Sequence, residues 1–562
     1  MKTSPVSLRE LLLVILYSSA ATIFTTINFF SQLLNIPPGR TFIGMTHYWI
    51  DFYYYLDQFW QGAHNSFSVI NKFTPEYYPP MFGYVNHLVL GKIGSLLGLE
   101  TFATYNLSLI LLKFLFFFLS YFFLRQVFEK NIQLRITALC LFVFATSYPL
   151  VREDELGTFF EPIRLFRAKN TISTRFGTIP QHVVTDILSL VTLWLMFDFL
   201  KKARTKIAFA YNNLTEIINN LKKNFLTLFS LSFTLTLLTL SDPAKSVTRI
   251  IPFAIAVMAG SYKRNVKFDL VSRGLILLIV FLPSVFLALL LKEQLSQQPL
   301  IQQANLWDIE NHKRQVYSLL HNLPYLFMSV GPILIPLLFL FGYVKKIFSR
   351  GEFFFLFLVL LTSVLGFVLP IWTIAPIPGF RFLSGISYLI LAIFGAYGTY
   401  KIKQLLRLNT VFIPLLIFVS LSLLTFIPSL VNRLQPPLEP DFTLTYPTND
   451  TYRGLKILEK LPSEKSIVLS SPYSYYYLMI PGLTGKVSFY AHFLLTKDFY
   501  QKEAKALRFF YQWGDAKLGS DFLHNNNIEY VVYAREKRDI KKTYPFLRVI
   551  FEGEKIGIYR VD

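Results

Sequence analysis

Long apolar runs recur along the chain, and they restrict its fold more than any other feature of the sequence. Residues 107–123 and 353–369 meet or approach the roughly 20 apolar residues that a helix needs to cross a hydrocarbon core of about 30 Å. Only helices and closed barrels satisfy their backbone in lipid, and continuous runs lack the alternation of a barrel strand. The chain is 53% hydrophobic and 16% charged, whereas soluble domains carry about a quarter charged residues. We therefore predict an all-α polytopic membrane protein.

The formal net charge of +21 lies mainly in short connections between the apolar runs. Lys and Arg gather at every second connection, as the positive-inside rule requires of cytoplasmic loops. We attribute the surplus to topology and to contact with anionic membrane lipids, and expect no nucleic acid partner. The N-terminus, with Lys2 and Arg9, is then cytoplasmic, and about eleven spans leave the C-terminus outside. The predicted spans are 10–34, 103–126, 135–151, 182–200, 224–241, 247–261, 268–291, 323–344, 352–373, 382–400 and 410–430.

Polar material concentrates on the predicted external side. It comprises the first loop at 36–102, the segments 152–181 and 292–322, a short turn at 373–380 and a C-terminal domain. Within the first loop, 51–65 and 80–99 read as amphipathic helices near the membrane surface, because Tyr and Trp belong at headgroup level. We divide the chain into a membrane domain at 1–436 and an extracytoplasmic domain at 437–562.

The C-terminal domain alternates short β-rich runs with helical patterns, which predicts a soluble α/β layer with a parallel core. Residues 551–555 read as the turn of a closing hairpin. The tyrosines at 473–477 and His492 are candidates to contact glycan; the alternatives for the tyrosines are that they fill the sheet or face the membrane. We do not expect His492 to be catalytic.

Asp51 is the carboxylate that stands out, since aromatic residues surround it in the sequence from His47 to Tyr55. A partly desolvated carboxylate has a raised pKa and suits a general base. The alternative is an interfacial carboxylate that simply faces water. Asp57, six residues later, points to another side of a regular helix, where it binds substrate or caps a turn.

The first loop resembles that of the membrane-embedded GT-C glycosyltransferases, in the branch of bacterial protein mannosyltransferases and lipopolysaccharide sugar transferases. That family carries an acidic residue after the first span, an aromatic patch and a glycine about ten residues on; Asp51, Tyr53, Tyr54, Tyr55 and Gly62 match those places. Phe52 follows Asp51 where many members have a second acidic residue. Further support comes from 78–80 and from Arg381 at the start of a late span.

The resemblance implies a polyprenyl-phosphate-linked sugar donor and a glycan, lipid or protein acceptor outside the cytoplasm of a bacterial or archaeal cell. Asp51 would deprotonate the acceptor hydroxyl, which attacks the anomeric carbon with inversion. The leaving lipid phosphate needs stabilising positive charge. Arg381 is the best single choice for that role, and a basic external segment offers others or contacts headgroups instead. Its cationic residues are Arg164, Arg167, Lys169, Arg175 and His182.

Glu153, Asp154 and Glu155 begin the same segment. Carboxylates suit Mg or Mn ions, and some members of the superfamily use a divalent metal, yet three adjacent acidic residues are more often simply solvated. Cys140 is the only cysteine, so no cysteine-based metal site or disulfide can form within the chain.

Two rival classes remain open from the sequence. A flippase or transporter for lipid-linked glycan places ionisable residues in mid-membrane, where this chain has few; Lys113 is the clear case. A non-catalytic receptor or assembly protein would use the external domain only for binding.

Overall fold

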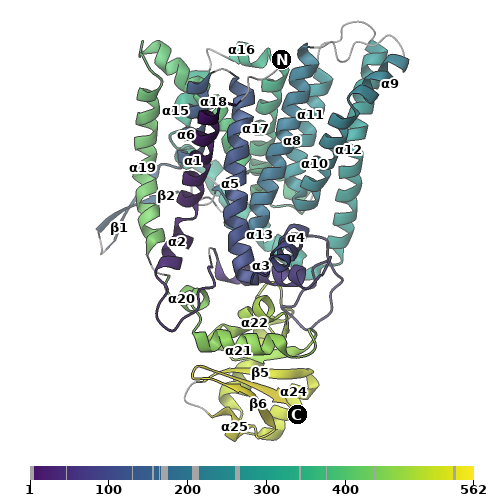
Figure 1. Ribbon diagram of the computed structural model, residues 1–562, viewed down its shortest axis with the longest axis vertical. Helices are drawn as coiled ribbons and strands as arrows, with labels where there is room; N and C mark the ends of the chain where they lie inside the picture. The colour runs from purple at the N-terminus through teal and green to yellow at the C-terminus, as the bar shows by residue number, and fades with distance from the viewer. Residues whose placement is uncertain are drawn as a thin grey trace.

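The computed structural model is mostly helical and has a bundle with a small α/β layer at one end (Figure 1). It describes residues 6–45, 47–129, 131–154, 157–163, 165, 175–205, 214–259, 266–340, 344–374, 376–435, 437–535 and 539–562. The N-terminus lies at the end of the bundle opposite the C-terminal layer.

Long helices along one direction build the bundle, and α5, with 28 residues, is about 42 Å long. Five of the described helices are long and apolar enough to cross a membrane, or six if the bent pair α9–α10 is one span. The bundle comprises α1 (Leu8–Thr25), α2 (Ile27–Leu34), α5 (Thr101–Phe128), α6 (Ile132–Phe144), α8 (Pro180–Thr205), α9 (Leu214–Lys223), α10 (Phe225–Ser241), α11 (Pro243–Ala259), α12 (Val266–Ser296), α13 (Pro299–His321), α14 (Leu323–Val330), α15 (Leu334–Leu338), α16 (Val344–Phe348), α17 (Gly351–Val368), α18 (Gly385–Leu405) and α19 (Phe412–Leu434).

The structure does not confirm the predicted number of eleven spans. The expected span at 323–344 is broken into α14, α15 and the start of α16. Gly331 ends α14 with a φ of 84°, a backbone conformation that an α-helix cannot continue through. The segment 292–322 is largely helical, as the end of α12 and α13. β1 (Pro149–Asp154) pairs antiparallel with β2 (Gly157–Pro162).

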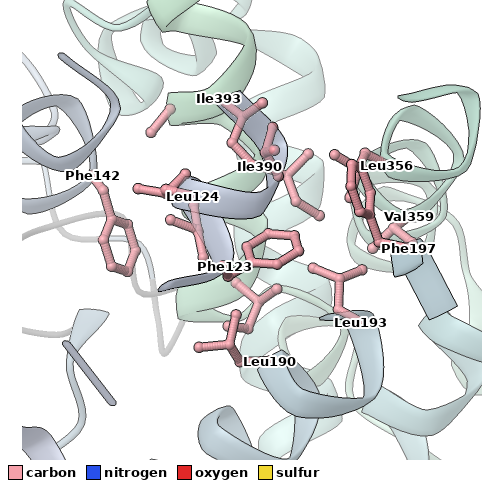
Figure 2. Packing of buried hydrophobic residues seen from close by; sticks show 14 of the residues in the cluster. Phe123, Leu124, Phe142, Leu190, Leu193, Phe197, Leu356, Val359, Ile390 and Ile393 are labelled. Carbon is pink, nitrogen blue, oxygen red and sulfur yellow. The ribbon is translucent and has the colours of Figure 1, made fainter. Parts of the chain in front are cut away.

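Interlocking apolar side chains hold the bundle together (Figure 2). Phe123 of α5, Leu193 of α8, Leu356 of α17 and Ile390 of α18 are all fully buried against one another. In lipid the hydrophobic effect does not drive helices together, so close van der Waals packing of these side chains has to supply the attraction.

Two helices of the first loop lie across the end of the bundle next to the C-terminal layer (Figure 1): α3 (Trp49–Ala63) and α4 (Val85–Leu96). Helices thus form at both places where the sequence predicted them. α3 is buried along most of its length, including Phe52, Tyr53 and Trp60. It is therefore a core helix rather than one that lies half in solvent.

The C-terminal layer contains a five-stranded sheet in the order β4-β3-β5-β7-β6. β3 pairs in parallel with β4 and β5, and β7 pairs antiparallel with β5 and β6, as the predicted parallel core and closing hairpin require. Its elements are α20 (Asp441–Thr445), α21 (Asn449–Lys460), β3 (Ile467–Ser470), α22 (Tyr476–Thr484), β4 (Val487–Ser488), α23 (Phe499–Leu507), α24 (Ala516–Asn525), β5 (Ile528–Ala534), α25 (Ile540–Thr543), β6 (Leu547–Glu552) and β7 (Ile556–Val561).

The C-terminal layer and α3 share one hydrophobic core. Phe52 and Leu56 of α3 belong to the same buried cluster as Leu478 and Met479 of α22 and the strands behind them. Hydrogen bonds reinforce the contact: the Tyr53 hydroxyl donates to the Leu444 carbonyl over 2.7 Å. The C-terminal layer is therefore fixed against the first loop, which brings residues far apart in the chain together near Asp51.

Candidate active site

Asp51 lies in the first turn of α3, at the junction between the bundle and the C-terminal layer. Its side chain is 27% exposed, so a ligand can reach the carboxylate. The Nε2 atom of His492, from the C-terminal layer, lies 3.4 Å from Asp51 Oδ1. His47, Tyr48 and Tyr105 are close enough to be influenced by the charge of this carboxylate.

His47 beside Asp51 is a neutral imidazole. Burial lowers the pKa of His47 to about 4, although the negative charge of Asp51 acts in the other direction. Its Nδ1 lies 3.2 Å from the Tyr48 carbonyl and its Nε2 lies 2.7 Å from the Tyr105 hydroxyl. Nδ1 therefore donates to the carbonyl, and Nε2 accepts from the hydroxyl. Because His47 is neutral at pH 7, it carries no positive charge that would lower the basicity of Asp51.

Aromatic rings continue from His47 along α3 and α4. The Tyr55 ring centroid lies 5.9 Å from that of His47, 6.0 Å from Tyr84 and 5.2 Å from His87. His87 is fixed by Gln58 Oε1 at 2.7 Å and by the backbone N–H of Gln181 at 3.2 Å. Burial lowers the pKa of His87 to about 3, so this ring is also neutral. These residues form an uncharged aromatic wall.

Arg381 lies in a short 3-10 helix (Gly379–Phe382) between α17 and α18. Burial alone lowers the pKa of Arg381, but the negative charge of Asp242 and the nearby Tyr84, Asp308 and Tyr55 raise it above its ordinary value. Tyr55 and Tyr84 are thus close enough to Arg381 to influence its charge, and their rings also lie beside the imidazoles near Asp51. The arrangement offers a carboxylate and a guanidinium connected by aromatic side chains.

The sequence analysis did not identify Asp242 as a neighbour of Arg381. It also did not indicate that tyrosines of α3 and the adjoining loop lie near both Asp51 and Arg381. Asp242 follows α10 directly, and its Oδ1 accepts from the backbone N–H of Ala244 at 3.1 Å, at the start of α11. The available signal was an acidic residue next to Pro243 in a turn between two predicted spans, on the predicted external side.

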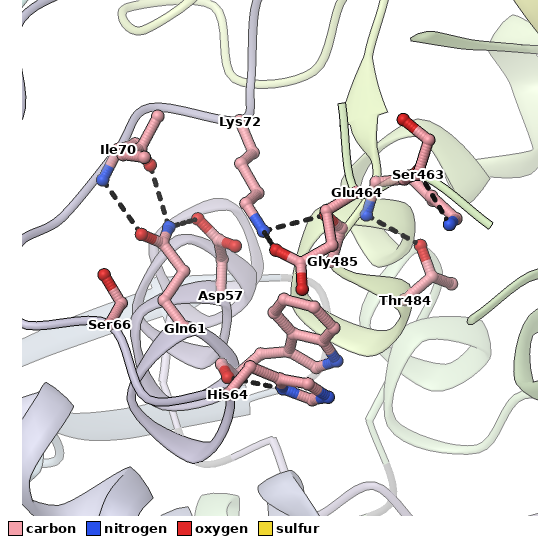
Figure 3. Close-up of polar contacts among 12 residues, drawn as sticks. Asp57, Gln61, His64, Ser66, Ile70, Lys72, Ser463, Glu464, Thr484 and Gly485 are labelled. Carbon is pink, nitrogen blue, oxygen red and sulfur yellow. Dashed lines mark hydrogen bonds and ion pairs between the residues drawn. The ribbon is translucent and has the colours of Figure 1, made fainter. Parts of the chain in front are cut away.

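Asp57, a predicted substrate-binding residue, has a fully buried side chain in a polar cluster on α3 (Figure 3). Gln61 Nε2 donates to Asp57 Oδ2 over 2.8 Å and also to the Ile70 carbonyl. Lys72 Nζ reaches between the first loop and the C-terminal layer, at 2.8 Å from the Gly485 carbonyl and 3.6 Å from Glu464. Asp57 belongs to this polar junction and acts on structure.

The other predicted cations lie apart from Arg381 or outside the described residues. Arg175 is fully buried in the bundle, where it donates to the carbonyls of Phe142 and Ala145 and stacks on Tyr388 at 4.2 Å. This burial does not fit phosphate binding. His182 is exposed in the first turn of α8. Arg164 and Arg167 lie outside the described residues.

The predicted metal ligands cannot be compared with the structure in full. The backbone of Glu153 and Asp154 lies in β1, and Glu155 is outside the described part of the chain. Within the described residues, no group of three or more His, Cys, Asp or Glu side chains has a geometry suited to a metal ion.

The fold that holds this site is similar to the folds of solved membrane glycosyltransferases of the GT-C type. Mycobacterial arabinofuranosyltransferase AftD matches all of this chain over 40% of its own length, with 14% identity and a TM-score of 0.51. The oligosaccharyltransferase of Archaeoglobus fulgidus in its apo form matches 93% of this chain and 69% of its own, with 13% identity and a TM-score of 0.50. The same archaeal enzyme, AglB, in complex with an inhibitory peptide and a dolichol-phosphate gives a TM-score of 0.49.

At these identities the likeness concerns the fold. No protein-family model matches the chain, and no curated protein matches it either. The resemblance inferred from the first loop is confirmed at the level of the GT-C fold.

Proposed function

We propose that the protein is a membrane glycosyltransferase that moves a sugar from a polyprenyl-phosphate-linked donor to an extracytoplasmic acceptor. The observation that carries this proposal is an accessible carboxylate, Asp51, and a guanidinium, Arg381, that both lie near the aromatic side chains of α3 and α4. Glycosyl transfer from a lipid phosphate needs a base at the acceptor and positive charge at the leaving group.

Asp51 acts as the general base. It accepts the proton of the acceptor hydroxyl while the hydroxyl oxygen attacks the anomeric carbon from the face opposite the phosphate. The bond between that carbon and the phosphate oxygen breaks, and the product has inverted configuration. The neutral state of His47 supports this role, because a charged imidazolium beside Asp51 would lower its basicity.

Arg381 stabilises the departing lipid phosphate. A guanidinium presents paired N–H donors that match phosphate oxygens, and it stays charged at any physiological pH. The tyrosines between Arg381 and Asp51 offer ring faces and hydroxyl groups against which a sugar can lie. The negative charges of Asp242 and Asp308 favour the charged form of the guanidinium.

The site faces the extracytoplasmic side in this proposal. The helices α9, with Lys222 and Lys223, and α16, with Lys345, lie at the end of the bundle opposite α3 (Figure 1). Basic residues mark the cytoplasmic ends of spanning helices, which supports the placement of α3 and the C-terminal layer outside. Nucleotide sugars are confined to the cytoplasm, so a site on this face requires a lipid-linked donor.

The experiment is sugar transfer by the purified protein in liposomes, using a panel of radiolabelled polyprenyl-phosphate sugars with native membrane extracts as the source of acceptor. The proposal predicts labelled product with at least one donor and inversion at the anomeric carbon. Liposomes without the protein are the control. Folded protein that transfers no donor, but moves lipid-linked glycan across the liposome bilayer, would establish a flippase instead.

A further inference from the structure

A turn of the C-terminal layer, residues 491–496, reaches the proposed general base. Its His492 is 5% exposed and presents Nε2 to Asp51 Oδ1 at 3.4 Å, across 441 positions of the chain. This separation is long for a hydrogen bond, and contacts of catalytic groups commonly tighten when substrate binds.

The hydrogen bonds of His492 fix which ring nitrogen carries the proton. The backbone N–H of Leu494 donates to Nδ1 over 3.1 Å, so Nδ1 is an acceptor in the neutral ring. The proton of neutral His492 is therefore on Nε2, the nitrogen that faces Asp51. An N–H donor aimed at one carboxylate oxygen fixes the orientation of the carboxyl group and favours its ionised form.

The turn that carries His492 is tied to the first loop on both sides. The Thr496 hydroxyl donates to the Phe73 carbonyl over 2.6 Å and accepts from the Ala491 N–H over 3.0 Å. Asn71 Nδ2 donates to the Leu495 carbonyl over 2.9 Å. The bonds to Phe73 and Asn71 join the turn to the same loop that contains α3, and the bond from Ala491 closes the turn, so the position of His492 relative to Asp51 is set by the fold.

The ring also makes purely aromatic contacts. It stacks on Phe493, with centroids 5.4 Å apart, and meets the edges of Tyr54 at 6.3 Å and Phe73 at 6.5 Å. A packing residue would need only these contacts. The direction of Nε2 toward Asp51 is the feature that packing does not explain.

From this geometry we infer that His492 is a positioning residue for Asp51, so that the C-terminal layer completes the active site of the transferase. The inference rests on the proposed function. His492 holds one oxygen of the carboxylate, while the exposed part of the group receives the proton of the acceptor hydroxyl. The C-terminal layer then has a part in the reaction itself besides any part in binding an acceptor.

The test compares two substitutions that separate the two roles of the ring. His492→Gln keeps an N–H donor and loses the aromatic face, whereas His492→Phe keeps the aromatic face and loses the donor. We expect His492→Phe to lower kcat by about 10- to 100-fold, the cost of a misplaced catalytic group, with KM for the lipid-linked donor unchanged. His492→Gln retains more activity than His492→Phe.

Two further variants complete the design. Thr496→Val removes both hydrogen bonds of the Thr496 hydroxyl and lowers kcat as His492→Phe does. His524→Phe, on an exposed face of α24, is the matched control and keeps wild-type kcat. Thermal unfolding of each variant confirms that the protein is folded.

Wild-type kcat for His492→Phe, or lower activity for His492→Gln than for His492→Phe, would overturn the positioning role. If Asp51→Asn is inactive in the same assay, the proposed function stands even though the positioning role of His492 has failed. If folded wild-type protein transfers no sugar from any donor, the proposed function fails, and the positioning role fails with it.

Discussion

Gly62 of α3 lies directly against Leu88 of α4: a Cβ atom at position 62 would stand 2.2 Å from the Leu88 carbonyl oxygen. The contact is reciprocal, since a Cβ at Gly91 would stand 2.2 Å from the carbonyl oxygen of Phe59. The glycine that matched the family pattern therefore allows two helix backbones to touch. This contact places Tyr84 and His87 beside Tyr55.

Gly62→Ala should force the two helices apart, because the obstacle is backbone and cannot move aside as a flexible side chain would. Overpacking of this kind costs about 1–3 kcal/mol. We expect a lower thermal unfolding temperature for the purified protein and reduced sugar transfer. Gly83→Ala, in the same loop with open space around its Cβ position, is the control and should unfold as wild type does. Equal stability of the two variants would contradict the packing role.

Asp57 should make stability depend on pH. Burial raises the pKa of Asp57 to about 7 from an ordinary value of 3.8, although Lys72 and Gln61 act in the other direction. Between these values the folded chain keeps a proton that the unfolded chain releases. This contribution to stability is therefore present in full below about pH 4 and is lost as pH rises to about 7.

Asp57→Asn cannot ionise and should lack this dependence. Thermal unfolding followed by tryptophan fluorescence should show the variant gaining stability relative to wild type between pH 5 and pH 8. A constant difference between the two proteins over that range would mean that Lys72 keeps the carboxylate charged throughout.

Arg381 should govern the use of the lipid-linked donor. Replacing it by Gln removes the charge at the leaving phosphate, and we expect kcat/KM for the donor to fall by about 100-fold or more. Arg381→Lys keeps the charge but lacks the paired N–H donors, so its kcat/KM for the donor should lie between those of Arg381→Gln and the wild type. Arg314→Gln, at an exposed position of α13, is the matched control. Unchanged donor kinetics in Arg381→Gln would remove Arg381 from the site.

Local sequence patterns predicted the features that depend on neighbouring residues, namely the membrane class and the secondary structure of the C-terminal layer. Apolar runs gave the membrane class, and alternating β-rich and helical segments gave the parallel core of the C-terminal layer together with its closing hairpin. The resemblance to the GT-C family rested on residues within one loop, and the fold bears it out. The count of spans depended on whether each apolar run continues as one helix, which a single residue such as Gly331 can prevent.

Contacts between residues that are distant in the chain could not be predicted from the sequence. Nothing near Asp57 in sequence indicates that it is buried close to Lys72, so its burial could not be anticipated. The same holds for His492, whose partner is 441 positions away, and for Arg175, which lies in the bundle core rather than on a basic surface. Such roles depend on tertiary packing that a single sequence does not encode locally.

The role of Asp51 as general base is tested most directly by comparing the rates of sugar transfer of Asp51→Asn and Asp57→Asn. Both are measured in liposomes with a donor that the wild-type protein uses. Both substitutions remove a carboxylate from α3, but only Asp51 is accessible. A general base contributes about 10²- to 10⁴-fold to rate. If Asp51 is the general base, the transfer rate of folded Asp51→Asn falls by that factor, whereas Asp57→Asn keeps a near wild-type rate at pH 6. Equal rates for Asp51→Asn and wild type would contradict the role of Asp51.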